Sequence, residues 1–178
     1  MHVLLHGGKT TYIAELMQNI GEIEAWDLYK HRINLVNENS KRLGINIINA
    51  KVKDASIFDP NYIEKFDKIL LDVPCLGIGV IKRKPDIKWQ KQEKDIGEIT
   101  KIQTKILDTC SKYLKAKGAI IYSTCSIFKE ENDKIINDFL NKNNNFEIEK
   151  INKGNNFLNI YPNDIQDGFF IAKITKRI

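Results

Sequence analysis

The sequence predicts an α/β fold built on a doubly wound, mostly parallel sheet with an antiparallel edge strand. Short apolar runs alternate along the chain with segments whose apolar residues recur every three or four positions, the pattern of strands alternating with helices. Residues 66–73 are apolar almost throughout, as in a strand buried on both faces of a parallel sheet. Two expected strands close the chain with no helix between them, so the pairing at that edge is expected to be antiparallel.

Turn residues and helical spacing delimit the individual elements. Gly21, Gly44 and Gly118 each follow a helical pattern and are expected to end it. The expected strands are residues 3–5, 23–26, 45–52, 66–73, 119–122, 146–151 and 169–174. The expected helices are residues 9–20, a segment ending at Gly44, a long segment with apolar positions 96, 99, 106, 110, 113 and 114, and a segment around 135–140. No repeat or linker divides the chain, so residues 1–178 are expected to form one domain.

Cysteine content and charge narrow the class of protein. Three cysteines among 178 residues are too few for a disulfide framework and lack zinc-site spacing, which indicates a reducing compartment and no metal site. The sequence has no leader-like N-terminus and no apolar run of membrane-spanning length, so a cytoplasmic protein is expected. The net charge of +5 and a pI near 9.0 favour a nucleic-acid partner.

A glycine loop after the first expected strand is typical of a cofactor site. Gly7 and Gly8 permit a tight turn and close backbone approach to a ligand at a helix N-terminus. Asp27 ends the next strand, where a carboxylate commonly binds ribose hydroxyls, although a capping role is the alternative. A P-loop would need glycine at Val3, and a dinucleotide G-x-G-x-x-G fingerprint is absent. The loop therefore indicates a nucleoside-containing cofactor.

Two cysteines, Cys75 and Cys125, stand at the ends of expected strands, where doubly wound sheets bind their ligands. Cys125 lies among hydroxyl residues just before an expected helix start at 130–133, whose N–H groups would stabilise a thiolate. Cys110 lies on an apolar helix face and is expected to fill the core. A cysteine-dependent hydrolase is disfavoured because all three histidines lie near the first two strands, away from the cysteines.

Further polar residues are expected around the same cleft. Asp72 would place a carboxylate at its mouth, with a loop cap as the alternative. The glycine-containing segment after Cys75 carries basic and aromatic residues suited to phosphates and bases, and an ordinary solvated loop is its alternative. The candidate nucleic-acid-binding residues are Lys82, Arg83, Lys84, Lys88 and Trp89.

Four stretches together resemble the RNA cytosine-5 methyltransferases that include bacterial ribosomal RNA enzymes and their nucleolar relatives. They are GGKTTYIAELM, LLDVPCLGIGVIKRKPDIKW, YSTCSIFKEEN and DGFFIAKITK, and they span almost the whole chain. The resemblance implies the Rossmann-like fold of S-adenosylmethionine-dependent methyltransferases, S-adenosylmethionine as cofactor, and a cytosine in RNA, expected to be ribosomal, as substrate.

The resemblance also implies roles for the site residues. Cys125 is expected to add to ring carbon 6 and make carbon 5 nucleophilic. Cys75 is expected to assist release by helping to remove the carbon 5 proton, and Asp72 to hydrogen-bond the nitrogen edge of an unstacked base. The implied cofactor-binding residues are Gly7, Gly8, Lys9, Asp27, Arg32, Asp54 and Asp72.

The sequence departs from the family pattern at three places. The family's cofactor loop usually reads Asp-x-Cys-Ala-Ala-Pro-Gly-Gly-Lys, whereas Met1 stands here at the acidic position and His6 at the proline. Leu76 replaces the small residue that usually follows the first cysteine. The usual N-terminal lead-in segment and RNA-binding domain are expected to be absent, and a separate chain would then supply the missing part. A catalytically silent RNA-binding remnant is the alternative function.

Overall fold

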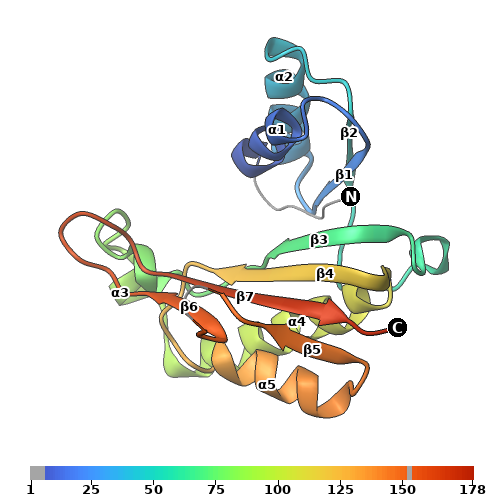
Figure 1. The fold of residues 1–178 in the computed structure, drawn as a ribbon. Coiled ribbons are helices and arrows are strands. Elements are labelled where there is room, and N and C mark those ends of the chain that lie inside the picture. Colours follow the sequence, from blue (N-terminus) through green and yellow to red (C-terminus); the bar gives the residue numbers. More distant parts are fainter. Residues whose placement is uncertain (1–6, 152–153) are drawn as a thin grey trace.

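The strands of the described chain form two sheets (Figure 1). The computed structural model describes residues 7–151 and 154–178, so the strand expected at 3–5 lies outside the described residues. The smaller sheet pairs β1 (Ile23–Asp27) with β2 (Ile48–Val52) in parallel. The larger sheet has the order β3 (Phe66–Asp72), β4 (Leu114–Thr124), β7 (Phe169–Lys176) and β5 (Phe146–Glu149), with β6 (Phe157–Ile160) also paired to β7.

Parallel and antiparallel pairs both occur, which confirms the expected α/β class with a mixed sheet. β3 and β4 are parallel, whereas β7 runs antiparallel to β4, β5 and β6. β7 itself is not at the edge, because β5 and β6 pair with its outer side. β6 was not expected, since its four residues are too short a run to separate from a loop by periodicity.

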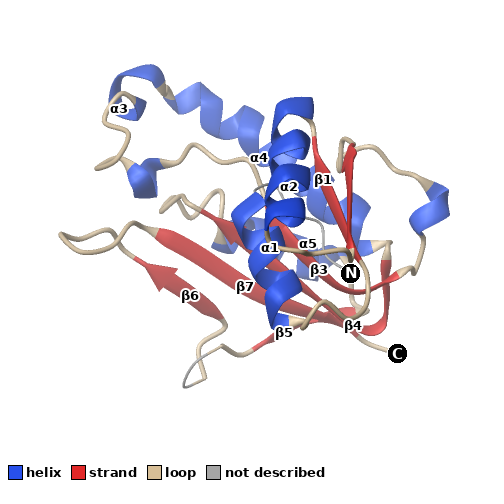
Figure 2. Ribbon diagram, turned by 90° about the horizontal axis from the view of Figure 1, so that it is seen from above, coloured by secondary structure: helices blue, strands red, loops and turns tan. Residues whose placement is uncertain are grey.

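The helices lie in two groups (Figures 1 and 2). α1 (Gly7–Leu16) and α2 (Lys30–Arg42) pack against each other and against the β1–β2 sheet. α4 (Glu93–Ser111) and α5 (Asp133–Lys142) cover one face of the larger sheet. Short helices lie in the connections, namely α3 (Ile87–Gln90) and the 3-10 turns η1 (Pro60–Tyr62) and η2 (Ile78–Val80). None of the helices in the described ranges is long and apolar enough to cross a membrane.

Two expected helix ends were wrong. α1 ends at Leu16 and not at residue 20, because Gln18 and Asn19 already adopt left-handed φ values of 53° and 58°. The long helix ends at Ser111, well before Gly118, and Leu114 begins β4. The carbonyl of Tyr113 accepts a hydrogen bond from the N–H of Phe66 at 2.9 Å, so pairing with β3 ends the helix.

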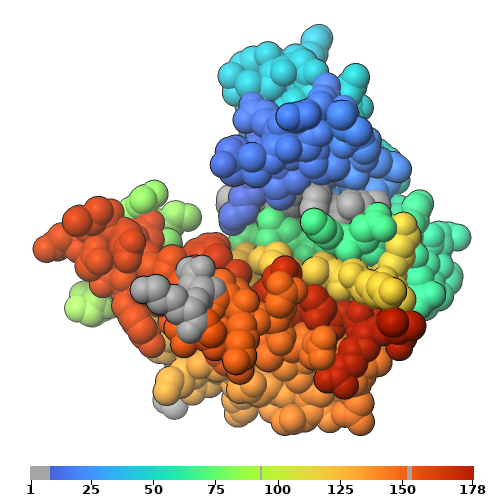
Figure 3. All heavy atoms as spheres, in the orientation of Figure 1, coloured from blue at the N-terminus to red at the C-terminus, as the bar shows by residue number. Residues whose placement is uncertain are grey.

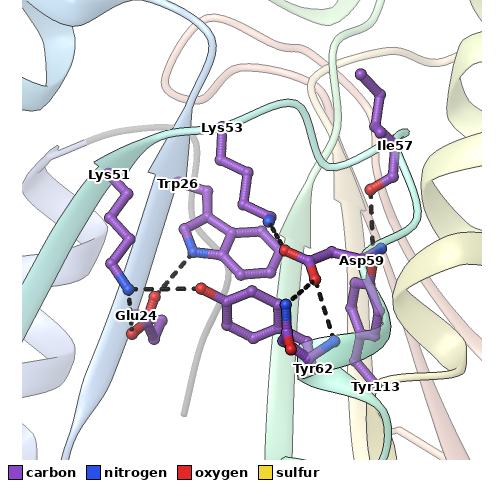
Figure 4. A network of polar contacts seen from close by, with 9 residues as sticks. Glu24, Trp26, Lys51, Lys53, Ile57, Asp59, Tyr62 and Tyr113 are labelled. Carbon is purple, nitrogen blue, oxygen red and sulfur yellow. Dashed lines mark hydrogen bonds and ion pairs between the residues drawn. The ribbon is translucent and has the colours of Figure 1, made fainter.

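An aromatic and charged junction connects the two sheets (Figure 4). Trp26 of β1 is buried and meets the ring of Tyr62 edge-on, with centroids 4.7 Å apart. The Glu24 carboxylate accepts hydrogen bonds from Trp26 Nε1 and Lys51 Nζ, each at 3.0 Å. Figure 3 shows the first part of the chain as a lobe on top of the rest. Trp26 also belongs to the core of the larger sheet, so this junction anchors the lobe.

Candidate active site

The pairing of β3 with β4 brings the two strand-end cysteines together. Asp72 is opposite Ser123 in the parallel register, and the N–H of Val73 donates to the carbonyl of Ser123 at 3.2 Å. Cys75 and Cys125 follow within a few residues, and their sulfur atoms lie 3.1 Å apart. The expectation that the two strands are neighbours is confirmed, and both thiols are partly buried at the carboxyl end of the sheet.

The contact between the thiols shifts their pKa values in opposite directions. The pKa of Cys125 lies below its ordinary value, chiefly because the Cys75 thiol donates a hydrogen bond to the Cys125 thiolate. The pKa of Cys75 lies well above its ordinary value, because the same hydrogen bond and burial favour its protonated form. Cys125 is therefore the thiol that ionises first.

The helix after Cys125 begins within the range that the sequence predicts. α5 starts at Asp133, and residues 129–132 before it form turns. The hydrogen bond from Cys75, and not a helix terminus, is the main cause of the lowered pKa of Cys125.

Asp72 lies between the cysteine pair and the start of α1. Its Oδ1 accepts a hydrogen bond from Ser123 Oγ at 3.2 Å, and its Oδ2 forms an ion pair with Lys9 Nζ. The charge of Asp72 also acts on the Cys125 thiol, where it opposes ionisation. A residue of the expected cofactor loop and an expected catalytic carboxylate thus contact each other directly.

The loop after Cys75 is pressed against the loop after Cys125. The N–H of Gly79 donates to the carbonyl of Cys125 at 3.0 Å, and the N–H of Gly168 donates to the carbonyl of Gly79 at 2.8 Å. A Cβ at Gly79 would stand 2.5 Å from the Gly168 oxygen and 2.7 Å from the Cys125 oxygen. Only glycine fits there, because both obstructing atoms belong to the backbone.

A buried polar network that sequence reasoning missed lies behind the cysteines. Glu131 accepts hydrogen bonds from the N–H of Leu76 at 2.9 Å and from Gln103 Nε2 at 3.0 Å, and its other oxygen accepts from Ser126 Oγ. No signal in the sequence distinguishes Glu131, which is fully buried, from the exposed Glu130 beside it. Leu76, the unusual residue after the first cysteine, has a buried side chain.

A second carboxylate stands at the end of β1, in the place expected for a ribose ligand. Asp27 is buried, its Oδ1 accepts a hydrogen bond from the N–H of Tyr29 at 2.8 Å, and its Oδ2 lies 3.4 Å from Arg32 Nη1. Arg32 therefore orients the carboxylate. The N–H of Lys53 donates to the Asp27 carbonyl at 3.0 Å, which brings the neighbouring Asp54 to the same end of the sheet.

These groups suit a nucleoside ligand in their chemistry. The oriented Asp27 carboxylate is an acceptor for paired hydroxyls, and α1 begins at Gly7, so its first N–H groups lie at the loop. The Asp54 carboxylate accepts from the N–H of Ser56 at 2.8 Å, which closes a turn that fixes its direction. Side chains within the described ranges offer no group of three or more His, Cys, Asp or Glu residues that could hold a metal ion.

The expected nucleic-acid-binding segment is exposed, but part of its charge is paired. Lys82 Nζ donates to the Asp164 carbonyl at 2.8 Å, and Arg83 Nε lies 2.9 Å from Asp167 Oδ2. Lys84 and Lys88 are exposed, and Lys88 Nζ lies 5.4 Å from the centroid of the Trp89 ring. Trp89 is 81% exposed, an unusual position for an indole.

Cys110 is a core residue, as expected. Its side chain is fully buried, and burial raises the pKa of the thiol to about 12. Sγ lies 3.7 Å from the carbonyl oxygen of Ala55. Cys110 is therefore a thiol of the same chain that takes no part in the site.

The α/β arrangement of the two sheets, the carboxylate after β1 and the polar ends of β3 and β4 define the class of this protein as an α/β domain with a candidate ligand site at the carboxyl ends of its strands. The sequence profile of the family described as "16S rRNA methyltransferase RsmB/F" matches residues 5–175. The chain belongs to this family.

Individual relatives support the assignment. The chain is 39% identical over 186 residues to the "Probable ribosomal RNA small subunit methyltransferase B" of Bacillus subtilis, covering 96% of this chain and 41% of that protein. It is 41% identical over 177 residues to the "Ribosomal RNA small subunit methyltransferase B" of Photorhabdus laumondii, covering 96% of this chain and 40% of that protein. The crystal structure of NSun6 from Pyrococcus horikoshii with SFG superposes with a TM-score of 0.84 at 32% identity, covering 98% of this chain and 47% of that chain. The chain thus spans about 40% of the length of these curated relatives.

Proposed function

We propose that the protein transfers a methyl group from S-adenosylmethionine to carbon 5 of a cytosine in RNA, through a covalent bond between Cys125 and the base. The single observation that carries this proposal is the 3.1 Å contact between the sulfur atoms of Cys75 and Cys125 beside Asp72. The lowered pKa of Cys125 suits a nucleophile, and the raised pKa of Cys75 suits a neighbour that holds and transfers a proton.

The first step uses the Cys125 thiolate. Its sulfur bonds to ring carbon 6, and the electron pair of the carbon 5–carbon 6 double bond makes carbon 5 nucleophilic. When bound, the donor would supply an electrophilic methyl group. Carbon 5 would bond to that methyl carbon as the methyl–sulfonium bond breaks, and the demethylated thioether would leave. Asp72 would lie at the nitrogen edge of the ring, where its carboxylate accepts a hydrogen bond from the exocyclic amino group and stabilises a proton held on ring nitrogen 3 as carbon 6 is attacked.

The second step uses Cys75. Once Cys125 is a thioether, Cys75 no longer donates to a neighbouring thiolate, so the main cause of its raised pKa is gone. Cys75 can then lose its proton to water and take the proton from carbon 5. The electrons of that C–H bond restore the carbon 5–carbon 6 double bond, and the bond to Cys125 sulfur breaks, which releases the thiolate.

The donor would be held at the end of β1 and at the start of α1. Asp27, oriented by Arg32, would bind the ribose hydroxyls, and Asp54 would lie near the adenine. The N–H groups at Gly7 and Gly8 would face the rest of the donor. Lys9 would hold Asp72 in place through their ion pair, which supports a donor site beside the cysteine pair.

The exposed segment after Cys75 would bind the RNA. Lys84 and Lys88 suit phosphates, and Trp89 offers a face on which an unpaired base can stack. Because the relatives are named as ribosomal RNA methyltransferases, we propose ribosomal RNA as substrate and the cytoplasm as the place of reaction. We also propose that the choice of cytosine involves further protein, in the same polypeptide or in a separate chain.

The direct test incubates the protein with S-adenosylmethionine labelled at its methyl group and with unmodified ribosomal or transfer RNA. Labelled 5-methylcytidine in the digested RNA is the expected product, and label on another base or position would refute the proposed chemistry. Calorimetric titration with the donor distinguishes the proposed enzyme from the alternative, a catalytically silent RNA-binding remnant. Saturable binding supports the enzyme, whereas no binding at millimolar donor supports the remnant.

A further inference from the structure

Glu131 is a buried carboxylate that connects the two loops carrying the cysteines. Its Oε2 accepts from the N–H of Leu76, the residue directly after Cys75. Its Oε1 accepts from the hydroxyl of Ser126, the residue directly after Cys125. One carboxylate therefore holds the chain immediately beyond each sulfur.

Two further groups keep this carboxylate in place. Gln103 of α4 donates through Nε2 both to Glu131 Oε2 at 3.0 Å and to the carbonyl of Pro74 at 2.9 Å. The Tyr122 hydroxyl donates to the backbone carbonyl of Glu131 at 2.8 Å. The network thus reaches the residues on both sides of Cys75.

The adjacent residue, Asn132, holds Cys125 from both sides in the same way. Its Oδ1 accepts from Thr124 Oγ1 at 2.6 Å, and its Nδ2 donates to the Ser126 carbonyl at 2.9 Å. Asn132 occupies the position before the first turn of α5, yet its side chain forms no capping hydrogen bond with that helix. Its polar atoms bind the residues that flank Cys125.

The charge of Glu131 does not help the thiolate. No ion pair of the described residues includes Glu131, so burial of this carboxylate depends on its hydrogen-bond donors. Its charge raises the pKa of both Cys75 and Cys125, which opposes ionisation of the nucleophile. The benefit of keeping a carboxylate there is therefore geometric.

We infer that Glu131 is a positioning residue that holds the loops after Cys75 and Cys125 at the separation where their sulfurs touch, with Asn132 as its partner on the Cys125 side. This inference deepens the proposed function and rests on it for its catalytic meaning. The geometric part can be tested without RNA or methyl donor.

The test measures how fast the two thiols can be joined. Diamide oxidises two thiols to a disulfide and takes up both hydrogen atoms, and the sulfurs must approach from 3.1 Å to about 2.05 Å. The rate of the Cys75–Cys125 crosslink, read by peptide mass spectrometry in a Cys110→Ser background, reports their mutual position. Glu131→Ala and Glu131→Asp are compared with Glu130→Ala, because Glu130 is the same residue type, adjacent and exposed.

We expect Glu131→Ala and Glu131→Asp to slow crosslinking by on the order of tenfold or more, since small displacements of paired reactive groups have large effects on rate. Glu130→Ala should crosslink at the parent rate. Circular dichroism establishes that each variant is folded, and Glu131→Asp carries the test if Glu131→Ala does not fold.

A second measurement separates positioning from simple support of the fold. Glu131→Gln keeps an oxygen toward Leu76 and Gln103 and turns its amide toward the Ser126 hydroxyl, which can accept. It should crosslink near the parent rate, while the midpoint of Cys125 alkylation by iodoacetamide moves to lower pH because a negative charge is removed.

The results distinguish this inference from the proposed function. Unchanged crosslinking in both Glu131→Ala and Glu131→Asp would overturn the positioning role, whatever the RNA assay shows. If the Glu131 variants crosslink slowly and the parent protein methylates no RNA, the result supports the positioning role and refutes the proposed function.

Discussion

The sulfur atoms of Cys75 and Cys125 are 50 residues apart in sequence and 3.1 Å apart in space. The parallel pairing of β3 with β4 accounts for this contact, because it aligns Asp72 with Ser123 and leaves both chains to continue past the same edge of the sheet. The contact also makes the two thiols chemically different, since it lowers the pKa of Cys125 and raises that of Cys75.

Replacement of Cys125 should abolish methyl transfer. Cys125→Ser substitutes a hydroxyl that does not ionise near neutral pH, so we expect loss of transfer below detection with donor binding unchanged in calorimetry. Cys110→Ser is the matched control, because it removes a thiol that lies outside the site. Full activity of Cys125→Ser would refute the assignment of the nucleophile.

The reactivity of the thiols should depend on pH in a defined order. Because the pKa of Cys125 is lowered, iodoacetamide should modify Cys125 before Cys75, with a midpoint below the ordinary thiol value of about 8.5. Cys75→Ala removes the hydrogen-bond donor, so the midpoint of Cys125 should move to higher pH. Peptide mass spectrometry after timed alkylation gives the order of modification and the midpoint for Cys125. A Cys125 midpoint that stays in place or falls in Cys75→Ala would contradict the contact between the thiols.

A methyl group at Gly79 should disturb the cysteine loop. Gly79→Ala places a Cβ against two backbone oxygens, so we expect a loss of roughly 1–3 kcal/mol in the free energy of unfolding together with reduced methyl transfer. Gly97→Ala is the control, since its Cβ would meet nothing within 4 Å on α4 and should stabilise the protein by roughly 0.5–1 kcal/mol. Denaturant unfolding measures both, and equal stability of the two variants would contradict the close approach.

The carboxylate after β1 should govern donor affinity. Asp27→Asn weakens acceptance from ribose hydroxyls and removes the ion pair with Arg32, so we expect donor affinity to fall by roughly 10-fold to 100-fold. Asp164→Asn is the control, because Asp164 is an exposed aspartate paired with Lys82 in another region. Calorimetric titration measures both variants, and an unchanged affinity for Asp27→Asn would place the donor elsewhere.

Some parts of this structure could be predicted from the sequence because they depend on local patterns. The apolar run ending at Asp72, the two glycines that open α1 and the cysteines after two strands are features of short stretches, and a parallel sheet gathers strand ends at one edge. The start of β4 at Leu114 could not be predicted, because its helical spacing was overridden by pairing with Phe66.

The support of the site depends on contacts between distant segments, which no local pattern encodes. In the sequence, Glu131 belongs to a charged run, residues 129–131, of a kind that is usually exposed to solvent. In the structure it accepts hydrogen bonds from Leu76 and Gln103, which lie in two other segments of the chain. The ion pair between Arg83 and Asp167 likewise depends on two loops that are far apart in the sequence and adjacent in the fold.

The most direct test of the central claim uses Cys75→Ser with RNA and the methyl donor. If Cys125 attacks the base and Cys75 assists release, this variant accumulates a covalent protein–RNA complex, and digestion with mass spectrometry finds a methylated cytidine attached to Cys125. A complex attached through another residue, or none in a variant that still methylates RNA at the parent rate, would contradict the account.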